Sequence, residues 1–231
     1  GSGRIVGKCH TCPKPPHVGG KHKATPYKLL TVRQMNFEFA QQINPDLEKL
    51  NFDKAISIGE TELRKLPNSD FHYILEKPLV GQAEDLAIWT EAFYNLATKK
   101  NKVGALYFEM NEFDINTDHW YIDSFAFSND GGLDLDDMEW LCDFDTDSQS
   151  ETETVFKLDG YEKLQEAFQN IELDTEDLQN ARDWCEQIVI ARFMELMTTA
   201  HKIAKTKKLN WAAVPIYFTE HSYDFIVKSD K

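Results

Sequence analysis

Four residues near the N-terminus have the types and the spacing of a zinc site. Cys9, Cys12, His17 and His22 follow the pattern C-x2-C-x4-H-x4-H. Two thiolates and two imidazoles satisfy the tetrahedral geometry that Zn²⁺ prefers, and small glycine-rich loops let the chain wrap the ion. Because four protein ligands leave no open position for a substrate, such a zinc would be structural. The alternative is a basic tail in which these residues bind no metal.

The fourteen residues from Cys9 to His22 resemble the zinc knuckle, whose pattern is C-x2-C-x4-H-x4-C. The fourth ligand here would be His22 in place of a cysteine, His10 stands where knuckles usually stack an aromatic ring, and the glycine-rich turn is displaced. The resemblance implies an adaptor or a module that binds single-stranded nucleic acid. Residues 1–30 carry six Lys or Arg and no acid, which suits that role. The remaining 19 basic and 39 acidic residues give a charge of −20, which opposes nucleic-acid binding by the body.

The region Val103–Phe156 holds fifteen acidic residues and no Lys or Arg. Such crowding is costly unless cations or a basic partner neutralise it. One interpretation is a solvated acidic loop. The other is a docking face that steers and binds a basic protein. The residues expected to meet Lys and Arg on that partner are Asp134, Asp136, Asp137, Glu139, Asp143, Asp145 and Asp147.

A calcium loop is a third interpretation of the same stretch. Asp143, Asp145 and Asp147 stand at positions 1, 3 and 5 of an EF-hand-like loop. However, Ser148 replaces the turn glycine, and position 12 is Thr154 where the motif has a bidentate Glu. The sequence therefore disfavours calcium.

A histidine with two acids nearby, His221 with Glu220 and Asp224, could support acid–base chemistry. The sequence has no recognised Ser or Cys nucleophile motif, no glycine-rich phosphate loop and no His-Glu-x-x-His. We therefore assign no catalytic residue, and a polar turn is the alternative.

Hydrophobic periodicity predicts an α+β fold, with helices packed on a small, mainly antiparallel sheet and a long helix near the C-terminus. The short spacing between the apolar runs 103–110 and 119–127, with a turn signal at Asn129–Gly132 after the second, favours antiparallel pairing. The predicted helices cover residues 32–43, 45–50, 52–66, 82–100, 161–171 and 175–205. The predicted strands cover residues 71–75, 103–110, 119–127, 152–158, 216–219 and 224–227.

Composition indicates a globular protein, with 42% hydrophobic residues, a net charge of −14 and no apolar run near the ~20 residues of a membrane span. We expect a basic Cys/His appendage over residues 1–30 and one acidic domain over residues 31–231. Four Cys residues, with Cys142 and Cys185 isolated in apolar surroundings, suggest reduced thiols and a cytoplasmic location.

The body also loosely resembles small bacterial immunity-type proteins and related bacterial domains of unknown function. It shares with them a helix, an aromatic strand pair, an acidic loop and a final sheet strand. That resemblance implies a cytoplasmic inhibitor of a toxin, often a nuclease. Two alternatives remain: a zinc-bearing adaptor that uses the N-terminal segment, and an enzyme with His221 in or near a pocket.

Overall fold

The computed structural model describes residues 38–111, 113, 119–221, 223 and 225–230. The predicted zinc ligands Cys9, Cys12, His17 and His22 and the predicted acid Asp224 lie outside these residues. Zinc binding by the N-terminal segment therefore stays a prediction.

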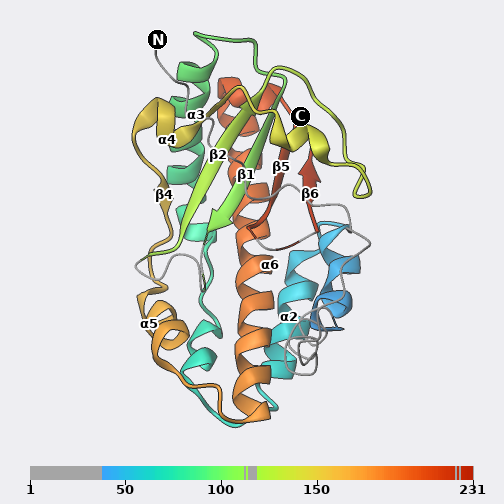
Figure 1. Cartoon of the computed structure of the whole chain (residues 1–231), viewed down its shortest axis with the longest axis vertical. Helices are drawn as coiled ribbons and strands as arrows, with labels where there is room; N and C mark the ends of the chain where they lie inside the picture. The colour runs from blue at the N-terminus through green and yellow to red at the C-terminus, as the bar shows by residue number, and fades with distance from the viewer. Residues whose placement is uncertain (1–37, 112, 114–118, 222, 224, 231) are drawn as a thin grey trace, which may run out of the picture.

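The described chain combines helices with a small sheet, which confirms the predicted α+β class (Figure 1). Residues 38–47 are helical, and the later helices are α2 Phe52–Leu63, α3 Ala83–Ala97, α4 Ser148–Thr152, α5 Glu162–Asn170 and α6 Glu176–Lys207. Four short 3₁₀ helices are η1 Asp70–Ile74, η2 Val80–Gln82, η3 Glu139–Cys142 and η4 Asn210–Ala213. The strands are β1 Ala105–Asn111, β2 Tyr121–Phe127, β3 Thr146–Asp147, β4 Phe156–Lys157, β5 Ile216–Glu220 and β6 Val227–Ser229.

The sheet is mixed, with the strand order β3-β2-β1-β5-β6, and β4 pairs with β2. The hairpin-like pair β1 and β2 is antiparallel, as predicted, with Ala105 opposite Phe127 and Asn111 opposite Tyr121. The pair β1 and β5 is parallel, because the chain returns from α6 to enter the sheet beside β1. The other pairs are antiparallel, so the prediction of a mainly antiparallel sheet is confirmed.

Three predicted strands differ from the structure, and the one at residues 224–227 shares only Val227 with β6. The predicted strand at residues 71–75 instead falls in η1, Asp70–Ile74, and its C-cap, since the backbone N–H of Ser69 donates to His72 Nδ1 at 3.1 Å and closes a turn. Within residues 152–158 only Phe156–Lys157 is a strand, because the Asp147 carboxylate caps α4 by accepting the N–H of Ser150 at 2.8 Å. A side chain that satisfies a helical N–H competes with strand pairing over the next residues.

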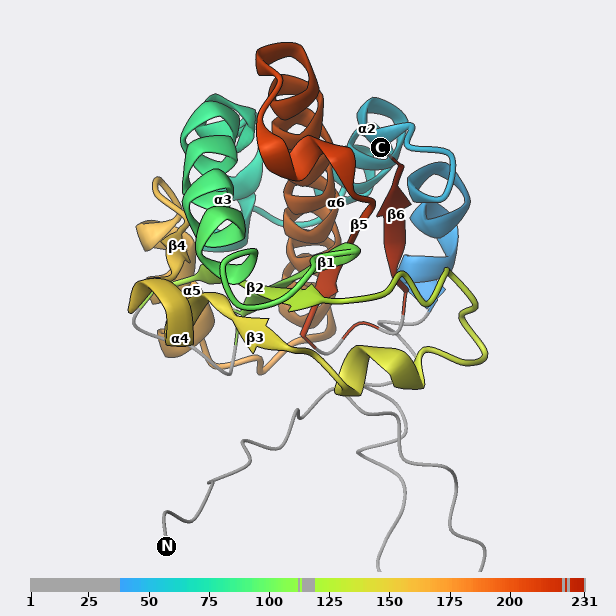
Figure 2. The same ribbon diagram turned by 90° about the horizontal axis from the view of Figure 1, so that it is seen from above.

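The long helix α6 organises the hydrophobic core. Its N-cap is Thr175, whose side chain accepts the N–H of Leu178 at 3.2 Å, and Lys208 ends it in a left-handed conformation. Helices α2, α3 and α6 cover one face of the sheet (Figure 2). The main hydrophobic cluster on that side runs from Ile43 to Val227 and includes the inward side chains of β1, Leu106, Phe108 and Met110.

His201 is a fully buried residue on α6. Its ring stacks on Trp211 with the centroids 5.2 Å apart, and its Nδ1 lies 2.9 Å from Ser229 Oγ. Burial, helped by Lys205, lowers the pKa of His201 to about 4. An unfolded histidine has a pKa of about 6.5. The folded state therefore resists protonation, and the stability this provides is present above pH 6.5 and lost as the pH falls toward 4.

We expect acid to cost wild-type protein up to about 3 kcal/mol of stability at His201, and we expect His201→Phe to escape that loss. Phenylalanine keeps a ring against Trp211 and cannot titrate. Burial raises the pKa values of Asp123 and Asp183 to about 6, which has the opposite sign, because their contribution is lost as the pH rises. Both proteins carry these aspartates. Urea unfolding of both proteins between pH 7 and pH 4 should therefore show that wild type loses more stability in acid than His201→Phe does. An equal loss in the two proteins would contradict this assignment.

Candidate functional site

The acidic strap, residues 128–147, connects β2 to β3 and lies on the sheet face opposite α6 (Figure 2). The ring of Trp140 packs edge-on against Phe127 and Tyr217, with centroids 4.8 and 5.1 Å apart. Phe144 packs in the same way on Phe125 at 5.1 Å. Buried Met138 and Leu141 belong to this second hydrophobic cluster. The strap is therefore held to the sheet by its own aromatic and aliphatic side chains.

Polar contacts fix the two ends of the strap. Asp130 accepts the hydroxyl of Tyr217 and, at 2.9 Å, the N–H of Gly132. Asp145 accepts the backbone N–H and the hydroxyl of Ser128 at 2.5 and 2.7 Å, which closes the strap on itself. A methyl group added at Gly131 would overlap the ring of Trp140, so glycine is required there for a steric reason.

The predicted partner-binding carboxylates divide into two groups. Asp145 and Asp147 have structural roles, because they accept hydrogen bonds from Ser128 and Ser150. The other group is exposed and consists of Asp134, Asp136, Asp137, Glu139 and Asp143. Two of these close small local turns, in which Asp134 accepts the N–H of Asp136 and Asp137 that of Glu139. Within the part of the chain that the structure describes, no Lys or Arg pairs with any of the seven.

Two leucines stand among these exposed carboxylates. Leu133 is 43% exposed and Leu135 is 51% exposed, and each adjoins Asp134. The described chain has four exposed large hydrophobic residues, and the strap contributes two of them. The strap thus exposes both apolar and acidic side chains.

The calcium interpretation gains no support from the geometry. Asp145 accepts hydrogen bonds from Ser128 and Asp147 from Ser150, and Asp143 is exposed. No group of three His, Cys, Asp or Glu among the described residues could hold a metal ion.

The carboxylate that contacts His221 is Glu109, which differs from the predicted acids Glu220 and Asp224. His221 Nδ1 contacts Glu109 Oε1 on β1 at 2.5 Å, and the hydroxyl of Tyr107 donates to Glu109 Oε2 at 3.0 Å. The hydrogen bond to Glu109 raises the pKa of His221. Because β1 and β5 are parallel neighbours, the residue just after β5 reaches a carboxylate in β1 that is 112 positions away in sequence.

A second buried carboxylate, Asp123 of β2, is paired with Glu109 on the neighbouring strand β1. Both of its oxygens accept hydrogen bonds from the Gln149 amide at 2.9 and 3.0 Å, and Asn111 donates to one of them at 3.3 Å. Burial, together with the charges of Glu109 and Asp147, raises the pKa of Asp123 to about 6. These hydrogen bonds tie β1, β2, α4 and the residue after β5 together.

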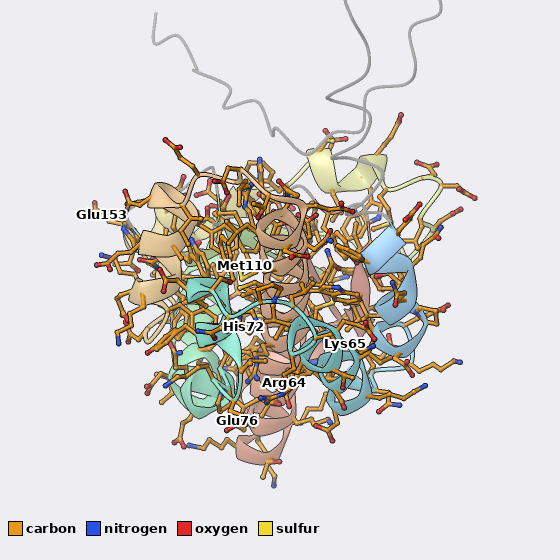
Figure 3. The ribbon with its side chains drawn as sticks, turned by 90° about the horizontal axis from the view of Figure 1, so that it is seen from below. Arg64, Lys65, His72, Glu76, Met110 and Glu153 are labelled. Carbon is orange, nitrogen blue, oxygen red and sulfur yellow. The ribbon has the colours of Figure 1, made fainter. Side chains whose placement is uncertain are left out.

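A separate ion-pair network joins α2, α6 and the turn after η1. The buried guanidinium of Arg192 donates to Glu60 Oε1 at 2.5 Å. Arg64 bridges Glu60 Oε2 at 3.4 Å and Glu76 Oε1 at 3.1 Å, and Figure 3 shows Arg64 between the end of α2 and Glu76. These contacts connect three structural elements.

The expectation of reduced thiols holds for one of the two body cysteines. Cys185 is a free buried thiol whose pKa is raised by burial, and an un-ionised thiol of this kind is inert. Cys142, in η3 of the strap, is disulfide-bonded, so the expectation of reduced thiols is wrong there and no longer supports a cytoplasmic location.

No family model, no curated protein and no solved structure matches this chain. No helix in the part of the chain that the structure describes is both long and apolar enough to cross a membrane. Function therefore has to be argued from the surfaces themselves.

Proposed function

We propose that this protein binds a basic protein partner through the acidic strap and neutralises it, in the manner of an immunity-type inhibitor of a toxin such as a nuclease. One observation carries the proposal: the strap exposes five carboxylates that have no basic partner among the described residues, and two exposed leucines, Leu133 and Leu135, lie in the same segment. Complementary charge speeds encounter and selects basic partners, whereas buried apolar side chains slow dissociation.

The way the strap is anchored also supports binding. A surface that is already in its bound shape loses less conformational entropy when a partner docks. Trp140, Phe144 and Leu141 hold the strap on the sheet, and Asp145 closes it on Ser128. The exposed Asp and Leu side chains are therefore presented by a backbone with fixed attachments at both ends.

The proposal is tested by selecting partners from a displayed library of protein domains and mapping the contact. We expect selected partners to be basic, to bind more weakly as salt rises, and to protect amides 130–144 from hydrogen exchange. Partners that protect only other elements, or whose affinity ignores salt, would overturn it. Co-expression with a selected toxin domain would then show whether binding also neutralises activity.

Gly131→Ala is expected to weaken partner binding about tenfold without removing any charge. The new methyl would displace the Trp140 ring and loosen the strap, and overpacking of this kind typically costs ~1–3 kcal/mol. Calorimetric titration with a selected partner measures the effect. Gly81→Ala is the matched control, because nothing lies within 4 Å of a methyl added there. Equal affinity of the two variants would show that anchoring does not matter.

A further inference from the structure

A cavity of about 440 Å³ lies on the other side of the molecule from η3, between the first turn of α3 and residues 153–159. Its volume is within the ~300–1,000 Å³ range of ligand sites. Residues from both elements line it, among them Gln82, Asp85, Glu153, Val155, Lys157 and Asp159.

The strand β4 presents an open edge to this cavity. Phe156 pairs with Ile122, and the N–H of Leu158 donates to the carbonyl of Trp120 at 2.9 Å. In an antiparallel pair, the backbone groups of alternate residues point toward and away from the neighbouring strand. Since residues 156 and 158 face β2, the N–H and C=O groups of Val155, Lys157 and Asp159 point away from it.

The fold itself satisfies one of these three outward positions. The side-chain amide of Gln82 donates to the carbonyl of Asp159 and accepts its N–H, both at 3.0 Å, as a neighbouring strand would. Among the described residues, no group pairs in this way with Val155 or Lys157. The open edge therefore begins next to Gln82 and runs along the cavity.

The edge is held firmly and is mostly acidic. Trp89 of α3 donates from Nε1 to Thr154 Oγ1 at 3.2 Å, and its ring packs on Phe156 at 5.9 Å. Asp85, Glu153 and Asp159 line the cavity, and no described Lys or Arg forms an ion pair with them. Figure 3 shows Glu153 at the outer margin of the molecule. Lys157 is the basic residue in the lining.

We propose that this edge binds an extended basic peptide, which adds as a strand beside β4. Its backbone would exchange hydrogen bonds with Val155 and Lys157, and its Lys or Arg side chains would meet Asp85 and Glu153. Addition of a strand to an exposed edge is a recurrent mode of peptide recognition, in which main-chain bonds provide affinity and side-chain contacts provide specificity. This site is independent of the acidic strap and of the function proposed for it.

The test uses a fluorescent nonapeptide of alternating Lys and Val, measured by anisotropy against the full chain. Two further peptides carry N-methyl groups on the odd or on the even residues. We expect saturable binding, and about a tenfold loss for the one methylated peptide whose blocked amides face β4. Equal loss for both peptides, or no loss for either, would overturn strand addition. Unchanged affinity after methylation would leave only the attraction of cations to an acidic surface.

Variants of the protein complete the test. Asp85→Asn with Glu153→Gln should weaken the peptide about tenfold, whereas Glu166→Gln with Glu172→Gln, on exposed residues elsewhere, should not. Val155→Pro removes an outward N–H that the fold does not use, so it should weaken binding and leave the thermal midpoint unchanged. If that variant fails to fold, amide shifts of wild-type Val155 and Lys157 on peptide addition decide the question, and no shift there refutes the proposal.

Discussion

Replacing Asp136, Glu139 and Asp143 together with lysine is expected to weaken binding of a basic partner about 100-fold. All three carboxylates are exposed, and none forms an ion pair within the described chain, so reversal changes attraction into repulsion without breaking an internal contact. A loss of this size corresponds to about 3 kcal/mol spread over three rim charges. Surface plasmon resonance at two salt concentrations would show most of the change in the association rate.

The matched control has the same change in net charge at a distance from the strap. Glu48, Glu166 and Glu172 are exposed, and their replacement with lysine also raises the net charge by six. If a general field of the acidic body attracts the partner, both triple variants lose affinity equally. If the strap is the binding surface, the control retains most of it. Retained binding by the strap variant would remove the proposal.

The elements with strong local signals were predicted well from the sequence. Helix α6 has a continuous apolar band, acids in its first turn and lysines in its last, and these features all favour the same element. The pair β1 and β2 was recognisable from its aromatic and β-branched runs. Short elements were harder, because η1 and α4 begin at side-chain contacts that periodicity does not reveal: the His72 ring accepts the N–H of Ser69, and the Asp147 carboxylate accepts the N–H and hydroxyl of Ser150.

The two parts of the candidate region differed in how far the sequence could predict them. The acidic strap is contiguous, so its carboxylates could be named in advance, although which of them serve the fold could not. The partner of His221 could not be predicted, because Glu109 is brought near by parallel pairing across more than one hundred residues. A lone charged residue inside an apolar strand run, as at Glu109 and Asp123, was the available signal. Such a residue indicates a buried polar network on one face of a sheet.

Glu60→Ala is expected to lower the free energy of unfolding by about 3 kcal/mol, the largest single effect on stability that we predict. Glu60 Oε1 accepts from Arg192 at 2.5 Å, and Arg192 Nε is already buried without a partner among the described residues. Removing the carboxylate leaves a buried guanidinium unpaired, which typically costs ~3–5 kcal/mol. It also takes an acceptor from Arg64 and from the N–H of Glu76. Urea unfolding at pH 7 measures the loss.

A double-mutant cycle separates the coupling free energy of the Glu60–Arg192 pair from the free-energy cost of leaving one partner buried and unpaired. Glu60→Leu combined with Arg192→Met removes both charges and restores apolar contact between α2 and α6, so the double variant should be more stable than Glu60→Leu alone and close to wild type. Glu60→Gln keeps an acceptor for Arg192 and should fall between. If Glu60→Ala costs less than ~1 kcal/mol, water reaches Arg192 and the contact between α2 and α6 does not depend on this pair. A large coupling energy would instead identify the pair as the polar contact that fixes how α2 sits on the helix that organises the core.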